Sequence, residues 1–300
     1  MIENRTRAAV RAATHPMPGL RDVVALGKPR LSGMVLTTAA AGMWLAPERI
    51  SAGRAAAFLL GTGMVVGAAN VLNNYFERDV DARMRRTWGR PLPAGRVEPG
   101  VALAIGMALP AFAVPLLALA TNPLTALLAA VAVVSYAFVY TPLKRVSTAA
   151  LFVGAVPGAI PPLMGWTAAT GRIDAPGIAL FALLFVWQIP HFLAISIYLK
   201  EDYARAGLRV FAVVHGERAA RWWAAATSAL LVPVGAAPAA LGMAGRGYGV
   251  AAALLAAGLT VVAASGLRQP EGSTRWARRY FLSTLLYLVL VFIALFLWAR

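Results

Sequence analysis

Residues 55–81 read AAAFLLGTGMVVGAANVLNNYFERDVD. Up to Ala69 the stretch is apolar or small, which is typical of a helix inside a membrane. Residues three and four apart share one face of a helix, and this spacing places together Asn70, Asn73, Asn74, Glu77 and Asp81. At 1.5 Å per residue this polar face is about 16 Å long. The sequence therefore predicts a membrane helix whose end carries a row of oxygen ligands.

The composition is that of a polytopic membrane protein. Of the 300 residues, 60% are apolar and 13% are charged, and the mean hydropathy is +0.68, which lies outside the range of soluble domains. The chain has no Cys and only three His, which excludes disulfides and thiolate sites and argues against a multi-histidine metal centre. The net charge of +16 is distributed as membrane topology requires, so we expect no nucleic-acid partner.

Nine apolar segments are near the length that a spanning helix needs. They are residues 31–46, 55–73, 101–120, 124–140, 148–168, 176–198, 219–241, 248–267 and 280–298. Of the 28 Lys and Arg residues, 23 lie in the N-terminal segment and alternate loops, and five lie on the other side. Because positive loops stay in the cytoplasm, we expect an all-α fold with nine transmembrane helices, a cytoplasmic N-terminus and an external C-terminus. Residues 1–25 would be a mobile basic cytoplasmic arm, and residues 26–300 a single transmembrane domain.

The polar end of residues 55–81 predicts a metal-diphosphate site. Carboxylates at Glu77 and Asp81, with the Asn73 amide one turn earlier, suit Mg²⁺, which leaves its other positions to water and substrate phosphate. Arginines, whose forked guanidinium groups suit phosphate, follow at positions 83, 85, 86, 90 and 96. Taken from spacing alone, a helix end with local ion pairs and a positive cytoplasmic loop is an equal alternative. The continuation of an apolar helix by polar side chains favours the site.

Tyr136 and Tyr140, followed by Lys144 and Arg145, end the fourth apolar segment. Tyrosines one turn apart followed by two cations could hold a diphosphate. An aromatic belt at the membrane interface with flanking positive charge gives the same pattern. Taken alone, the pattern favours the belt.

His191 lies inside the sixth apolar segment, after Trp187, Gln188 and Pro190. An ionisable side chain at that depth is a functional candidate by default, and Pro190 would loosen the backbone. His191 could bind a substrate, move a proton, or bond only to a neighbouring helix.

Glu201 and Asp202, next to Tyr203, follow the sixth segment. They are either a second metal-facing group or a solvated loop pair. The fifth segment carries a run of glycines and prolines that predicts repeated helix breaks, which suit a helix lining a cavity or packing closely. That run consists of Gly154, Pro157, Gly158, Pro161, Pro162 and Gly165.

The stretch Asn73-Asn74-Tyr75-Phe76-Glu77-Arg78-Asp79-Val80-Asp81 resembles the first acidic motif of the UbiA-type intramembrane prenyltransferases, Asn-Asp-x-x-Asp-x-x-x-Asp. Further blocks, in family order from residue 26 to about 216, are similar to the protoheme IX farnesyltransferase (haem O synthase) branch. They are Lys28-Pro29-Arg30, Asp81-x-x-Met84-x-Arg86-Thr87-x-x-Arg90-Pro91-Leu92, Tyr140-Thr141-Pro142-Leu143-Lys144-Arg145, Pro157-Gly158-Ala159 to Pro161-Pro162 with Gly165-Trp166, Trp187-Gln188-x-Pro190-His191-Phe192 and Asp202-Tyr203-x-x-Ala206-Gly207.

The resemblance implies nine helices around a central cavity in a bacterial inner membrane, with the active site facing the cytoplasm. It implies Mg²⁺-dependent transfer of a farnesyl group from farnesyl diphosphate to a vinyl group of haem B, giving haem O for terminal oxidases. Haem A synthase or oxidase assembly factors are further implied partners, besides the lipid bilayer. The implied metal ligands are Asn73, Glu77, Asp81 and Asp202. The implied catalytic residues are Asn73, Glu77, Asp81, Arg90, Lys144 and His191. The implied substrate-binding residues are Arg86, Arg145, Tyr136, Tyr140, Trp187, Gln188, Asp202 and Tyr203.

The sequence departs from the family pattern in three places. After Gly207 it reads Leu208-Arg209-Val210-Phe211-Ala212-Val213, where this branch usually has Met-Leu-Pro-Val, so the geometry of this loop stays open. Asn74 and Glu77 replace two aspartates of the general motif, and the second acidic site has only Glu201 and Asp202, so the number of Mg²⁺ ions stays open. A prenyltransferase acting on a quinone precursor is one alternative, against which the haem-branch blocks argue. A transporter is another, because broken helices and polar residues near the membrane midplane suit transport. Most of the acids, however, lie in the predicted cytoplasmic loops.

Overall fold

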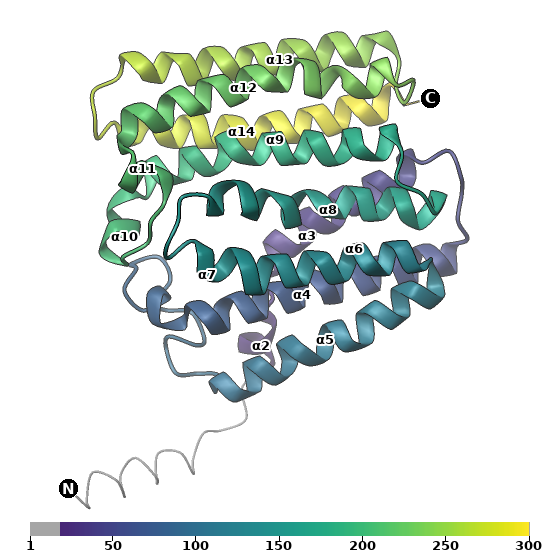
Figure 1. Cartoon of the computed structure of the whole chain (residues 1–300), viewed down its shortest axis with the longest axis horizontal. Coiled ribbons are helices and arrows are strands. Elements are labelled where there is room, and N and C mark those ends of the chain that lie inside the picture. Colours follow the sequence, from purple (N-terminus) through teal and green to yellow (C-terminus); the bar gives the residue numbers. More distant parts are fainter. Residues whose placement is uncertain (1–18, 300) are drawn as a thin grey trace, which may run out of the picture.

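The computed structural model describes residues 19–299, which form an all-α bundle (Figure 1). Eight of the described helices are long and apolar enough to cross a membrane. They are α4 (Ala52–Asp81), α5 (Pro99–Ala120), α6 (Pro123–Val134) continued by the π-helix η1 (Ser135–Tyr140) and α7 (Thr141–Leu143), α8 (Ala150–Thr170), α9 (Ala175–Tyr198), α12 (Gly216–Ala240), α13 (Arg246–Ser265) with the 3-10 helix η2 (Gly266–Arg268), and α14 (Thr274–Leu297).

The predicted first span is α3 (Pro29–Leu45), which has only 17 residues. The multi-pass helical fold is therefore confirmed, whereas the total of nine spans stays a prediction. Most of the predicted arm, residues 1–25, lies outside the described residues. Its last part belongs to a short helix, α2 (Leu20–Leu26), which ends at the fully buried side chain of Leu26.

Short elements gather at one end of the bundle, on the left of Figure 1. They include α7 and two helices between α9 and α12, namely α10 (Lys200–Arg205) and α11 (Phe211–Val214). The polar end of α4 lies at the same end of the bundle. This arrangement brings segments that are far apart in the sequence around one group of polar side chains.

Helix boundaries follow local signals. Pro99 is the first residue of α5, where a missing N–H costs nothing. The side chain of Asn122 accepts a hydrogen bond from the N–H of Thr125 at 2.9 Å and so caps α6. Gly171 ends α8 in the left-handed conformation, with φ of 71°.

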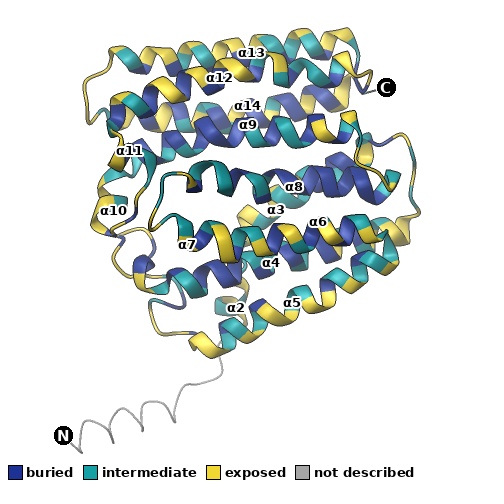
Figure 2. Ribbon diagram, in the orientation of Figure 1, coloured by how far each residue is buried: buried dark blue, intermediate teal, exposed yellow. Residues whose placement is uncertain are grey.

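The central helix is α8, which packs against α3, α6 and α9 and is largely buried, whereas α5 exposes one face (Figure 2). The expected breaks at its prolines are wrong, because α8 is one continuous helix. Its small residues serve close packing instead. A Cβ on Gly165 would lie 2.0 Å from the Ala39 carbonyl oxygen, and one on Gly42 of α3 would lie 2.0 Å from that of Pro162.

This contact predicts that Gly42→Ala will lower the free energy of unfolding by about 1–3 kcal/mol, because the added methyl group forces two backbones apart. The measurement is thermal unfolding of the detergent-solubilised protein. Gly33→Ala, on the same helix, is the control, since its Cβ has nothing within 4 Å and alanine favours the helix. Equal effects of the two substitutions would contradict the contact between α3 and α8.

Candidate functional site

The polar face of α4 is buried. Asn73, Asn74, Glu77 and Asp81 are each less than 5% exposed, whereas Asp79, off this face, is exposed. The helix runs without interruption from the apolar part to Asp81. A solvated helix end therefore does not describe these side chains.

Both carboxylates on this face pair with cations from other segments. Arg90 Nη1 donates to Asp81 Oδ2 at 2.7 Å, and Lys144, just after α7, forms an ion pair with Glu77. Burial disfavours the charged form of Lys144, but the attraction and hydrogen bond of Glu77 prevail and raise the pKa of Lys144. Each buried carboxylate therefore has a cationic partner, which offsets the cost of removing its charge from water.

Lys28 belongs to this group, although it was absent from the predicted site residues. Its Nζ donates to Asn73 Oδ1 at 2.7 Å, and Asn73 Nδ2 donates to Thr141 Oγ1 at 3.2 Å. Lys28 is the one described non-glycine residue with positive φ, at 49°, a conformation that residues other than glycine seldom adopt. Burial and the nearby Arg90 lower the pKa of Lys28 to about 7. The sequence did contain a signal for Lys28, namely the block at residues 28–30. That block supported the family resemblance but was not used to predict site residues.

The neighbouring amides hold the turn between α2 and α3 against α4. Asn74 Nδ2 donates to the Leu26 carbonyl oxygen at 2.8 Å, and Asn70 Nδ2 donates to that of Gly27 at 3.2 Å. An aspartate at position 74 would have no hydrogen to donate. The departure from the family aspartate thus has a structural use here.

The side-chain oxygens on this face are suitable ligands for Mg²⁺. Asp81 Oδ1 is buried and has no hydrogen-bond partner, and the oxygens of Glu77 and Asn73 lie on the same helix face. No group of three or more His, Cys, Asp or Glu side chains comes together within residues 19–299. An ion bound there would have two carboxylates and an amide as protein ligands, and water or phosphate oxygens would complete its shell. Asp202, the predicted fourth ligand, forms an ion pair with Arg205 at 3.1 Å, and its role as a metal ligand stays a prediction.

The loop after α9 covers the end of this polar face. Tyr203 packs with Val80 of α4 and with Met84, which follows that helix, and burial raises the pKa of Tyr203. The N–H of Arg209 donates to the Lys144 carbonyl oxygen at 3.2 Å. Tyr203, Lys144 and Arg209 line a cavity of about 160 Å³. Tyr203 therefore lies at a cavity, where the predicted contact with a substrate is sterically possible.

The predicted arginines divide between the site and the surface. Arg145 donates to the carbonyl oxygen of Phe76, on α4 beside Glu77. Arg86 is exposed, and Arg96 pairs with Asp22 at 3.0 Å on the surface. Of the arginines at positions 83, 85, 86, 90 and 96, Arg90 is the one that contacts a buried carboxylate, that of Asp81.

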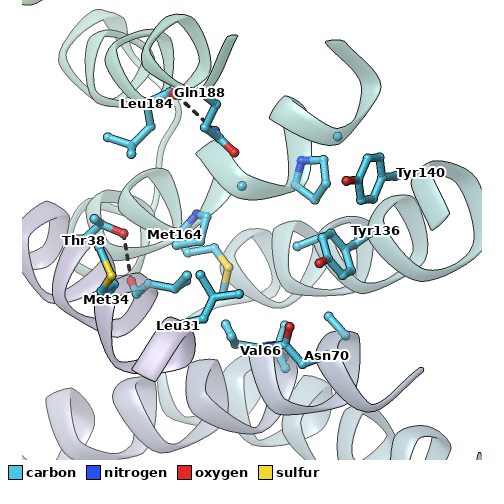
Figure 3. A pocket seen from close by; sticks show the side chains of 18 of the residues that line it. Leu31, Met34, Thr38, Val66, Asn70, Tyr136, Tyr140, Met164, Leu184 and Gln188 are labelled. Carbon is cyan, nitrogen blue, oxygen red and sulfur yellow. Dashed lines mark hydrogen bonds between the residues drawn. The ribbon is translucent and has the colours of Figure 1, made fainter. Parts of the chain in front are cut away.

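A second, apolar part of the site adjoins the charged part. A cavity of about 250 Å³ lies between α3, α4, η1, α8, α9 and α14; we call it the main cavity. Figure 3 shows Tyr136, Tyr140 and Asn70 around it. The aromatic-belt interpretation is thus wrong for both tyrosines. They belong to the π-helix η1, and π-helical turns are frequent at functional sites. Tyr140 connects the two parts, because Lys144 Nζ lies 5.5 Å from its ring.

The residues predicted on α9 line the same cavity. Trp187 stacks on His191 with ring centroids 4.8 Å apart. Gln188 Nε2 donates to one carbonyl of α8 and one of α9, each at 3.1 Å. Its Oε1 occupies space that a Cβ on Gly158 would take. His191 Nδ1 lies 2.8 Å from Oγ1 of Thr284, which the sequence did not indicate, since a single Thr in an apolar helix is ordinary.

Known proteins resemble the chain in sequence and in fold. Residues 35–286 match the family model described as the UbiA prenyltransferase family. Proteins named protoheme IX farnesyltransferase are similar over nearly the whole chain. One from Anaeromyxobacter dehalogenans is 61% identical, covering 97% of this chain and 98% of the relative, and one from Myxococcus xanthus is 48% identical, covering 91% and 93%.

Two solved structures share the fold. A digeranylgeranylglyceryl phosphate synthase superposes with a TM-score of 0.79 at 17% identity, covering 94% of this chain and 98% of that one. A UbiA homologue from Archaeoglobus fulgidus, bound to GPP and Mg²⁺, superposes with a TM-score of 0.71 at 16% identity. The match covers 91% of this chain and 99% of that one.

The ion pair between Glu77 and Lys144 predicts an asymmetric mutant cycle. Lys144→Met should lower the free energy of unfolding by about 3 kcal/mol, because it leaves the Glu77 carboxylate buried and unpaired. Glu77→Gln combined with Lys144→Met should recover most of that loss. The measurement is chemical unfolding in detergent.

The control is Arg205→Met, which removes a surface ion pair in which Arg205 is 43% exposed, and should cost less than about 1 kcal/mol. Additive effects of the Glu77 and Lys144 substitutions would contradict a direct pair.

Proposed function

The chain belongs to the UbiA prenyltransferase family, and on that premise we propose that it transfers a farnesyl group from farnesyl diphosphate to a vinyl group of haem B, in a Mg²⁺-dependent reaction. The observation that carries the proposal is the junction of two environments. Buried Glu77 and Asp81, with their cations, adjoin the apolar main cavity. An anionic head with a long apolar tail fits this junction, and the relatives' shared name supports haem B as the acceptor.

Asn73, Glu77 and Asp81 would hold Mg²⁺ together with the diphosphate. The ion would supply positive charge to the leaving diphosphate, and the UbiA homologue from A. fulgidus that shares the fold is bound to GPP and Mg²⁺. Lys28, Arg90 and Lys144 would donate hydrogen bonds to the diphosphate oxygens. Three cations crowded around a buried site repel one another, and an entering anion relieves that repulsion. Their fixed positions favour the state in which diphosphate charge is greatest.

The main cavity would hold the farnesyl chain and keep water from its reactive carbon. Its lining is mostly apolar, so an allylic cation formed there is shielded until the acceptor attacks. The rings of Tyr136 and Tyr140, 5.3 Å apart, present faces that stabilise positive charge. His191 and Trp187 form the wall where the porphyrin would lie.

The reaction balances with one water molecule. The bond between the first farnesyl carbon and the diphosphate oxygen breaks, and the vinyl group of the haem forms a carbon–carbon bond to that carbon. Water adds to the resulting cation and loses a proton, which leaves a hydroxyethylfarnesyl substituent. The products are haem O, diphosphate and a proton.

We expect Glu77→Gln and Asp81→Asn each to abolish turnover, because each removes a ligand charge from the metal site. The measurement uses membranes supplied with haem B, farnesyl diphosphate and Mg²⁺, followed by haem extraction and mass spectrometry for haem plus farnesyl plus water. Asp79→Asn is the matched control, since Asp79 is exposed on the same helix, and should leave the product unchanged. EDTA should remove the product.

Near-normal haem O formation by either site variant would overturn the metal assignment. A wild-type protein that prenylates 4-hydroxybenzoate and leaves haem B intact would instead overturn the choice of acceptor.

We further propose nine spans, with α3 crossing the membrane as well, a cytoplasmic N-terminus and a site that faces the cytoplasm of the inner membrane. The 17 residues of α3 reach about 26 Å at 1.5 Å per residue, close to the roughly 30 Å of a bilayer core. The distribution of Lys and Arg supports this orientation.

Alkaline phosphatase fused after Arg300 should therefore be active, and the same enzyme inserted at Gly95 should be inactive. Fluorescent-protein fusions at the two positions should show the reverse. An inactive phosphatase at Arg300 would leave an even number of spans and overturn the topology.

A further inference from the structure

The hydrogen bonds of Thr284 assign the proton on His191. Thr284 Oγ1 donates to the Phe281 carbonyl oxygen of its own helix at 2.6 Å. A hydroxyl has one hydrogen, so toward His191 Nδ1, at 2.8 Å, the Thr284 oxygen acts as the acceptor. The neutral His191 ring must then carry its hydrogen on Nδ1 and leave a lone pair on Nε2.

The ring is also held in orientation. Trp187 stacks on it at 4.8 Å and 21°, and the Phe281 ring lies 4.9 Å away. Trp187 is itself fixed, because its Nε1 donates to the Thr284 backbone oxygen at 2.7 Å. One residue of α14 therefore anchors His191 through its side chain and Trp187 through its backbone.

The free nitrogen belongs to a side chain that lines the main cavity. The only side-chain hydrogen bond of His191 among residues 19–299 is the one between Nδ1 and Thr284. A neutral imidazole with one nitrogen tied to a fixed acceptor and the other bare is the arrangement of metal-binding histidines.

We propose that Thr284 is a positioning residue, which holds His191 in the Nδ1–H tautomer so that Nε2 binds the iron of a metalloporphyrin acceptor in the main cavity. This inference rests on the proposed haem acceptor and deepens it. Iron coordination would fix the distance and the tilt of the porphyrin relative to the farnesyl chain. It gives a role to α14, which lies outside every motif of the sequence.

The tautomer can be read without any haem. The chain has three histidines, so the full-length protein labelled with ¹⁵N-histidine gives few imidazole signals, and His191→Gln assigns one of them. We expect an Nδ1–H, bare Nε2 pattern for His191 in the wild type and in Thr284→Ser. Thr284→Val, which keeps the shape but lacks the hydroxyl, should lose that pattern. A wild-type ring with its hydrogen on Nε2, or a Thr284→Val protein with an unchanged pattern, would overturn the tautomer assignment.

Iron binding is tested with ferric protoporphyrin IX added to the same proteins and followed by visible absorption. The wild type and Thr284→Ser should show a histidine-ligated spectrum, which His191→Ala loses. Thr284→Val should bind the porphyrin about 10–100-fold more weakly, as expected for loss of the group that orients a metal ligand. Ser283→Ala is the control, since its hydroxyl bonds the Arg279 carbonyl oxygen instead, and should match the wild type.

The two proposals fail in different ways. If His191→Ala keeps the wild-type spectrum and the wild type still makes haem O, iron ligation is overturned and the proposed function stands. If the wild type neither binds nor converts the porphyrin, the haem acceptor is overturned as well.

Discussion

The burial of two carboxylates on one face of α4 is the constraint on which the site depends. Charge that leaves water must be paired, because an unpaired buried ion costs several kcal/mol. Glu77 and Asp81 meet this requirement with Lys144 and Arg90, which come from segments on either side of α5 and α6. The loops at this end of the bundle therefore adopt the positions that bring those cations inward. A pair of this kind adds little net stability, but it places positive charge where an anion would enter.

The charged and apolar parts of the site are continuous, and this continuity selects the class of substrate. Tyr140 lines the main cavity and lies beneath the Lys144 ammonium group. Such a junction accepts a molecule with a compact anionic head and a long apolar tail. The central helix α8 leaves space beside η1 and α9, because its small residues let α3 approach without filling it; the proposed farnesyl chain would lie in this space.

The C-terminal third of the chain carries no motif, yet it completes the wall of the cavity. Thr284 and Leu288 of α14 lie against residues of α9. The helices of this third also pack closely on one another and on α9. This packing fixes α14 against α9 and so places the Thr284 hydroxyl next to His191 Nδ1.

Hydropathy and helical periodicity alone determined the membrane class, the positions of the long helices and the polar face of α4 with Asp79 left off it. These are local properties, since a helix places residues three and four apart together whatever surrounds it. The family also followed from sequence, because its motifs are short blocks in a fixed order. Only the tertiary structure decided that Lys28 contacts Asn73, that Tyr136 and Tyr140 face a cavity, and that Asp202 pairs with Arg205. It also showed that α8 is unbroken and that Thr284 meets His191. Each of these outcomes depends on which helix faces share an interface, and that choice is made by packing across the whole bundle rather than by the residues next in sequence.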